Sequence, residues 1–226
     1  MTELSLTQAV LLVAWGTLVA LDLVSIPQAM FSRPLVAGTV AGWIAGDVEA
    51  GLRTGVLLEL FALDVLPIGA VRYPDYGPAA VAAAALAAGV SWELGLGLAA
   101  TLGLVLATAG GWSLQLVRRS NARAIQRRAA ALAAGEGPAI RRLQYAALVR
   151  DAARGAALTT VGLALAWALA AGLRLDRATA LGLTLVCVGS AIAAGVNGAV
   201  RSAGRDVRLR WLAAGAAVGL VLAALR

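Results

Sequence analysis

Residues 33–75 of this chain, RPLVAGTVAGWIAGDVEAGLRTGVLLELFALDVLPIGAVRYPD, decide its fold. This stretch places glycines, prolines and carboxylates inside strongly apolar sequence. A carboxylate at the centre of a membrane helix costs about 2.5 to 3.5 kcal/mol, so it needs a polar partner or a water-filled cavity. The stretch is therefore typical of a site within a membrane where a polar group is bound or moved.

The composition of the whole chain predicts the same environment. Of 226 residues, 61% are hydrophobic and 14% are charged, and the mean hydropathy is +0.84. These values predict an all-α polytopic membrane protein, with residues 1–226 forming a single membrane domain. All 19 basic residues are arginine and the net charge is +7, but most arginines lie in short gaps between apolar stretches. The positive-inside rule accounts for such arginines, so nucleic-acid binding is not expected.

Two segments of the deciding stretch have unusual lengths. Residues 34–46 are too few to cross about 30 Å of hydrocarbon at about 1.5 Å per residue, so they predict a re-entrant segment or half-helix. Residues 54–71 are numerous enough to span a membrane as a helix. However, Pro67 removes a backbone donor and clashes with the preceding turn, so the last part of this segment is expected to be irregular.

The other apolar stretches predict about six spanning helices. They cover residues 4–21, 78–117 as two spans with a turn at 91–93, 155–173, 178–200 and 211–225. Between them, residues 118–154 carry nine arginines and a GEGP break at 135–138. The positive-inside rule places this loop in the cytoplasm, and its alanine-rich arms are expected to be helical and to lie against anionic membrane lipid.

The glycines of the deciding stretch recur at helical spacing. Gly38, Gly42 and Gly46 follow one another every four residues, and Gly51 and Gly55 repeat the interval. Residues at this spacing share one helix face, where small side chains let two backbones approach closely. The pattern indicates tight helix packing, with or without a direct role in a site. A closely packed short helix can also hold its termini at mid-membrane, beside a polar ligand.

The carboxylates of this stretch are the first candidates for a site. Glu59 is flanked by leucines and Phe61, which favours a functional role over a structural hydrogen bond between helices. Asp64 follows five positions later, about 140° around the helix, so the two do not form an acid/base pair. Asp47 either caps the next helix or belongs to the site. Asp75 lies in a proline-bracketed loop beside Arg72 and Tyr73.

These residue types fit a neutral sugar better than other ligands. Carboxylates accept hydrogen bonds from adjacent hydroxyls, and aromatic rings pack on the apolar face of a pyranose. An anion would need an arginine deep in the apolar segments, and the sequence predicts none there. The chain has no histidine and only one cysteine, Cys187, so neither a transition-metal site nor a cofactor is expected.

A set of motifs in this region resembles a known family. It comprises Arg33-Pro34-Leu35, Gly42, Gly46-Asp47, Gly51, Gly55, Glu59, Ala62-Leu63, Ile68-Gly69-Ala70 and Pro74-Asp75. Across residues 31–90 the chain resembles the enzyme IIC subunit of the mannose/fructose/sorbose family of the bacterial sugar phosphotransferase system (PTS).

The resemblance implies a sugar-translocating subunit of the bacterial inner membrane that is not itself an enzyme. It would bind a hexose or amino sugar and assemble, as part of an oligomer, with a IID membrane subunit, while soluble IIA and IIB proteins carry the phosphoryl group. It also implies that Glu59 and Asp75 contact the sugar, with Asp47 and Asp64 as further candidates. The family usually has small residues where this chain has Val71, Arg72 and Tyr73, so Arg72 and Tyr73 are candidates for altering the sugar site.

Two alternatives belong to other functional classes. The first is a non-transporting membrane scaffold or sensor, derived from such a subunit, whose arginine-rich loop docks a cytoplasmic protein. Genes for partner subunits beside this one would favour transport over the scaffold. The second is an intramembrane aspartyl protease, suggested by IAGD at 44–47, although Ile44 replaces the first glycine of the Gly-x-Gly-Asp motif. Such an enzyme needs two acids that share a proton.

Overall fold

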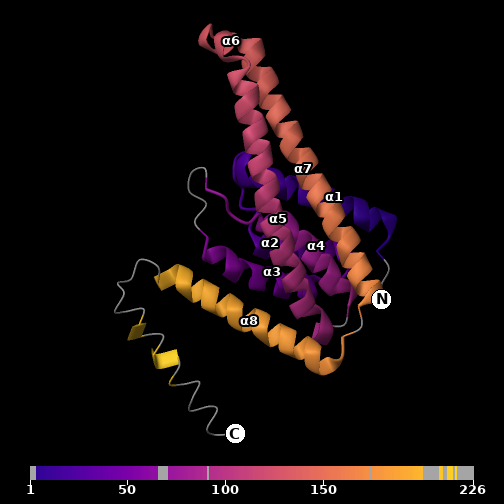
Figure 1. Ribbon diagram of the computed structural model, residues 1–226. Coiled ribbons are helices and arrows are strands. Elements are labelled where there is room, and N and C mark those ends of the chain that lie inside the picture. The colour runs from indigo at the N-terminus through magenta and orange to yellow at the C-terminus, as the bar shows by residue number, and fades with distance from the viewer. Residues whose placement is uncertain are drawn as a thin grey trace.

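The computed structural model describes residues 4–65, 71–90, 92–173 and 175–200, together with 209, 210, 213–215 and 217. All regular structure in these residues is helical, which confirms the all-α class (Figure 1). The helices are α1 (Leu6–Val24), α2 (Pro34–Ala45), α3 (Val48–Leu63), α4 (Tyr76–Gly89), α5 (Trp92–Gln126), α6 (Ala129–Ala133), α7 (Gly137–Gly172) and α8 (Arg177–Val200).

In the described part of the chain, four helices are long and apolar enough to cross a membrane: α1, α5, α7 and α8. Helices α2 and α4 are apolar but shorter, so the two spans predicted within 78–117 are instead one short helix, α4, and one long helix, α5. The predicted turn at 91–93 is misplaced, because Trp92 and Glu93 already belong to α5. The predicted span at 211–225 lies almost entirely outside the described residues.

The short segment predicted at 34–46 is confirmed as α2. It starts at Pro34, where the missing N–H of proline costs nothing because the first amides of a helix have no partner within it. It ends at Gly46, whose φ of 95° is a left-handed conformation that favours glycine. The chain then turns directly into α3.

Helix α3 differs from the predicted 54–71 segment at both ends. It starts at Val48 because the carboxylate of Asp47 accepts a hydrogen bond from the Ala50 amide at 2.9 Å and caps the helix. It ends at Leu63, after 16 residues, so it is too short to span a membrane. Pro67 lies outside the described residues.

The predicted close packing of the glycines is confirmed between α2 and α3. A Cβ atom added at Gly42 would lie 2.7 Å from the Cα of Gly51, and one added at Gly51 would lie 2.4 Å from the carbonyl oxygen of Gly38. Two side chains of α1 also bind α2. Trp15 Nε1 and Gln8 Nε2 each donate a hydrogen bond of 3.0 Å to an α2 carbonyl.

Helix α4 is the centre of the bundle. Every residue from Gly77 to Ala87 is buried, most of them alanine, and the helix contacts α1, α2, α3, α5 and α7. A helix that is apolar on all sides is expected in such a fully buried position. Its small side chains allow the surrounding helices to pack closely around it.

The arginine-rich stretch 118–154 is not a separate loop. Helices α5 and α7 continue through it for total lengths of 35 and 36 residues, and α6 joins them at a tip that projects from the bundle (Figure 1). Alanine and arginine favour helix formation, which explains the continuation. The expected helical arms are thus confirmed, as is the break, where Gly135 has a φ of 73°. The cytoplasmic location stays a prediction.

Candidate functional site

A pocket of about 230 Å³ lies where the ends of four elements meet. Its wall comes from the end of α1 and the connection after it, the start of α2, the end of α3 and the connection before α4. The lining residues are Leu23, Gln28, Met30, Ser32, Arg33, Pro34, Ala62, Val65, Tyr73, Pro74 and Tyr76. A small pocket with amide, hydroxyl, guanidinium and phenol groups suits a small polar ligand with an apolar face.

Asp22 holds the connection that forms one wall of this pocket, although sequence reasoning did not select it and it is not itself a lining residue. Its side chain is fully buried at the end of α1 and accepts hydrogen bonds from the amides of Ala29 at 2.6 Å and Ser32 at 2.8 Å. These bonds fold the α1–α2 connection back onto α1. The sequence could have indicated this role, because Asp22 is a lone carboxylate near the end of an apolar helix, and a buried carboxylate needs hydrogen-bond donors.

Glu59 has the polar partners that its apolar surroundings require. It forms an ion pair with Arg33 and accepts a hydrogen bond of 3.2 Å from the amide of Leu35. That amide is one of the free N–H groups at the start of α2, where negative charge is favoured. Glu59 therefore connects α3 to α2 and holds Arg33, which lines the pocket, whereas Glu59 itself is not among the lining residues.

Asp75 lies just before α4, outside the four candidate spans, and its side chain is completely buried. It does not line the pocket. Its Oδ2 atom lies 2.6 Å from Nη1 of Arg154, a residue of α7, and its amide donates to the carbonyl of Ala107 at 2.8 Å. Burial raises the pKa of the Asp75 carboxyl, although the charge of Arg154 acts in the opposite direction. The geometry makes Asp75 an anchor for the connection that carries Tyr73 and for the start of α4 at Tyr76.

Arg154 is buried at the centre of a charged network. Its Nε lies 2.7 Å from Oδ1 of Asp151, and the other oxygen of Asp151 accepts a hydrogen bond from Ser25. No arginine was expected deep in the apolar segments; Arg154 directly precedes the apolar stretch 155–173 and is buried in the bundle. Because α7 is continuous through this region, Arg154 faces the bundle rather than a loop. In the sequence, the i,i+3 spacing of Asp151 and Arg154 beside the small residue Gly155 could have indicated a buried ion pair.

The side chains of Arg72 and Tyr73 both bind α5. The Tyr73 hydroxyl accepts a hydrogen bond of 2.7 Å from Arg118, whose guanidinium also lies 5.1 Å from the Tyr73 ring centre. The Arg72 guanidinium lies 4.0 Å from the ring centre of Trp112. Tyr73 lines the pocket, whereas Arg72 is exposed and does not.

Asp47 and Asp64 act at the two ends of α3. Asp47 is the exposed cap described above, and Asp64 accepts a hydrogen bond of 2.6 Å from Asn197 of α8. Of the six candidates from the sequence, only Tyr73 lines the pocket. In the described residues, no group of three or more His, Cys, Asp or Glu side chains is placed to hold a metal ion.

Comparison with known proteins places this architecture in a family. Residues 6–196 match the family model described as PTS system sorbose-specific IIC component. The chain is 38% identical over 78 residues to the sorbose-specific EIIC component of Klebsiella pneumoniae and over 80 residues to the mannose-specific EIIC component of Escherichia coli K12. These alignments cover 34% and 35% of this chain, and each covers only 29% of the relative's length.

A third relative, N-acetylgalactosamine permease IIC component 1 of Escherichia coli K12, is 30% identical over 106 residues, 47% of this chain and 38% of the relative.

Two solved structures share the fold. One, described as "Structure of membrane protein", is similar with a TM-score of 0.75 at 24% identity. The other, a complex of the mannose transporter ManYZ with microcin E492, gives a TM-score of 0.63 at 22% identity. Each alignment covers 99% of this chain and 96% of the other. The structures support the all-helical membrane fold, and the family model covers most of the sequence: the chain belongs to the family of PTS sorbose-specific IIC components.

Proposed function

We propose that this chain is a sugar-translocating IIC-type subunit of a bacterial PTS, located in the inner membrane. The ligand would be a hexose or amino sugar, bound in the pocket at Tyr73 and Tyr76. The observation that carries this proposal is the pocket's combination of two phenol rings with amide, hydroxyl and guanidinium groups. Family membership and the sugars named in its relatives support the same ligand class.

The proposed division of labour within the pocket follows from side-chain chemistry. The rings of Tyr73 and Tyr76 would pack on the apolar face of a pyranose. Gln28, Ser32 and Arg33 would exchange hydrogen bonds with the sugar hydroxyls. Glu59 would act on the sugar through Arg33, by holding the guanidinium against the pocket wall.

Partner subunits would supply the chemistry that this chain lacks. A IID membrane subunit would complete the translocation pathway in an oligomeric assembly, and IIA and IIB proteins would transfer the phosphoryl group to the sugar. The chain itself would bind the sugar and expose it alternately to each side of the membrane. Phosphorylation on the cytoplasmic side would then trap the product.

Glu59→Gln tests the site with little change of shape. The chain is reconstituted with its IID partner in proteoliposomes, and uptake and binding are measured across hexoses and amino sugars. Glutamine can still accept the hydrogen bond from Leu35, but it loses the ion pair with Arg33. Loss of a charged hydrogen bond of this kind is expected to reduce uptake of the recognised sugar about tenfold or more.

Glu49→Gln is the matched control. Glu49 lies on the same helix and also pairs with an arginine, Arg53, but on the exposed surface away from the pocket. This control is expected to keep uptake within about twofold of the parent, because exposed i,i+4 pairs contribute little. Unchanged uptake by an assembled Glu59→Gln complex would contradict the role of Glu59, and absence of binding by every sugar would contradict the proposed function.

A further inference from the structure

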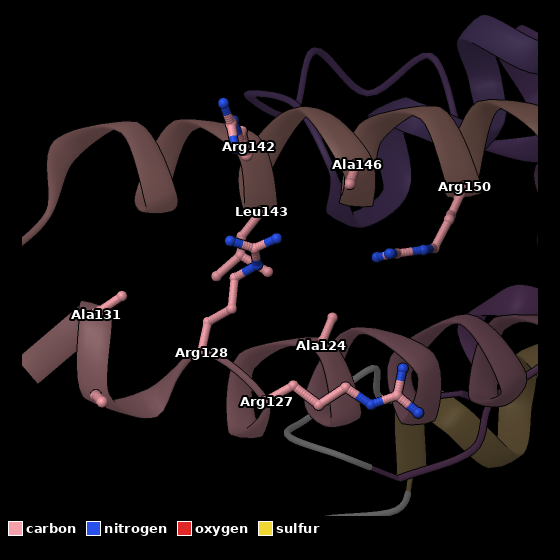
Figure 2. A pocket seen from close by; sticks show the side chains of 9 residues that line it. Ala124, Arg127, Arg128, Ala131, Arg142, Leu143, Ala146 and Arg150 are labelled. Carbon is pink, nitrogen blue, oxygen red and sulfur yellow. The ribbon is translucent and has the colours of Figure 1, made fainter.

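The arms of the α5–α7 hairpin enclose a cationic cleft of about 640 Å³ (Figure 2). Arg127 and Arg128, which follow α5, line one side, and Arg142 and Arg150 of α7 line the other. Figure 2 shows the side chains of Arg128 and Arg150 reaching into the space between the arms. The rest of the lining consists of alanines and Leu143, so arginine determines the chemistry of the cleft.

These guanidinium groups have no acidic partner in the described part of the chain. The ion pairs found there involve Arg33, Arg53 and Arg154. Arg150 donates a hydrogen bond of 2.8 Å to Asn121, which is a neutral amide. Guanidinium groups remain charged and bind phosphate oxygens through paired hydrogen bonds. The cleft is therefore suited to a phosphate-bearing anion.

A second hollow, of about 340 Å³, lies between the same arms on the turns nearer the bundle. Its walls include the apolar side chains of Leu114, Val117 and Leu148. Its carboxylate, Asp151, is paired with Arg154, which also pairs with Asp75. The hydrogen bond between Arg150 and Asn121 joins a residue of the cationic cleft to one of this hollow. A charged cleft followed by a partly apolar hollow fits an anionic amphiphile.

The outer surface of the arms favours a lipid over a soluble acidic protein. Both arms expose large apolar side chains, namely Trp112, Leu116, Ile125, Tyr145 and Val149. Exposed apolar groups interspersed with arginine are typical of helices at a membrane interface. A protein docked in the cleft would leave these outer side chains in water, whereas surrounding lipid covers them.

We infer that the hairpin binds an anionic phospholipid between its arms. The phosphate lies between Arg128 and Arg150, while Arg127 and Arg142 add positive charge at the same cleft. An acyl chain follows Leu114, Val117 and Leu148 toward the bundle. This site is separate from the sugar pocket, so each assignment can fail without the other.

The double variant Arg128→Gln/Arg150→Gln tests the site. The full chain in uncharged detergent is titrated with phosphatidylglycerol, and bound lipid is counted by native mass spectrometry. Each arginine near a lipid headgroup contributes enough that the double variant is expected to bind about tenfold more weakly or worse. The control Arg123→Gln/Arg141→Gln removes the same charge from the same region but outside the cleft, and it is expected to change binding less than about twofold.

The single variant Arg128→Gln covers the case in which loss of the Arg150–Asn121 bond disturbs the arms. It leaves that bond intact and is expected to weaken binding about fivefold. Equal losses in both double variants would overturn the inference, because the attraction would then be diffuse. Full competition by sn-glycerol 3-phosphate would identify a free phosphate ligand instead. A cleft-dependent affinity for polyglutamate, with unchanged phosphatidylglycerol binding, would identify an acidic protein and also overturn it.

Discussion

The Arg154 guanidinium lies between the carboxylates of Asp75 and Asp151, and all three side chains are buried. Replacing Arg154 with methionine would keep much of the side-chain volume but leave two buried carboxylates without their cation. Breaking a buried ion pair from one side costs about 3 to 5 kcal/mol. We therefore expect Arg154→Met to lower the unfolding temperature clearly, measured by circular dichroism of the chain in detergent.

Arg53→Met is the matched control, because Arg53 pairs with Glu49 on the exposed surface of α3. Such a pair contributes about 0.3 to 0.5 kcal/mol, so the control is expected to unfold near the parent temperature. Adding Asp75→Asn to Arg154→Met removes one uncompensated charge and is expected to recover part of the loss. An Arg154→Met protein that unfolds at the parent temperature would show that the network does not stabilise the fold.

Single residues were predictable where their chemistry demanded a partner. Glu59 inside apolar sequence required a polar neighbour, and Arg33 and the Leu35 amide provide it. Arg154 was not predictable in this way, because its burial depends on how α7 is rotated against the bundle. In the sequence, Arg154 is one of nine arginines in residues 118–154. Only the packing of α7 in the bundle shows that its side chain is buried.

At the scale of elements, the crossing of α2 and α3 depends on glycine. A Cβ atom at Gly51 would lie 2.4 Å from a carbonyl oxygen of α2, a distance at which the backbones must move apart. We expect Gly51→Ala to destabilise the fold by about 1 to 3 kcal/mol, as overpacking typically does. The measurement is thermal unfolding in detergent, together with the yield of monodisperse protein.

Gly182→Ala serves as the control, because Gly182 lies within helix α8 with nothing within 4 Å of its added Cβ. Alanine in an open helical position is expected to stabilise by about 0.5 to 1 kcal/mol. If both variants unfold at the same temperature, the close approach of α2 and α3 does not determine stability.

The boundaries of helices were harder to predict than their existence. Apolar sequence placed the start of α3 near Thr54, but the Asp47 cap extends the helix back to Val48, across a turn that contains the charged residues Glu49 and Arg53. The helical arms expected from alanine in 118–154 are confirmed, but they continue the apolar parts of α5 and α7 instead of belonging to a separate loop. In both cases local backbone chemistry extended a helix beyond its apolar part.

For the whole molecule, the connection that carries Tyr73 and Asp75 joins the pocket to the base of the hairpin. Arg118 of α5 binds Tyr73, and Arg154 of α7 binds Asp75. Gly111 of α5 permits the close approach, since an added Cβ would lie 2.3 Å from the Tyr73 carbonyl oxygen. The pocket wall therefore depends on the hairpin base. Among the described residues, no hydrogen bond or ion pair joins the hairpin tip, residues 127–136, to this connection, and helix α6 packs mainly on α7.

Replacing the tip with a glycine/serine linker of equal length should therefore separate the two proposed sites. Such a linker is flexible and long enough to join α5 to α7 without strain. We expect sugar binding within about twofold of the parent, because the pocket contacts at Arg118 and Arg154 remain, and at least about tenfold weaker phosphatidylglycerol binding, because Arg127 and Arg128 are lost. Both affinities are measured on the same preparation, with a linker of the same composition carrying arginine at 127 and 128 as the control. Loss of sugar binding at an unchanged unfolding temperature would instead show that the tip is coupled to the pocket.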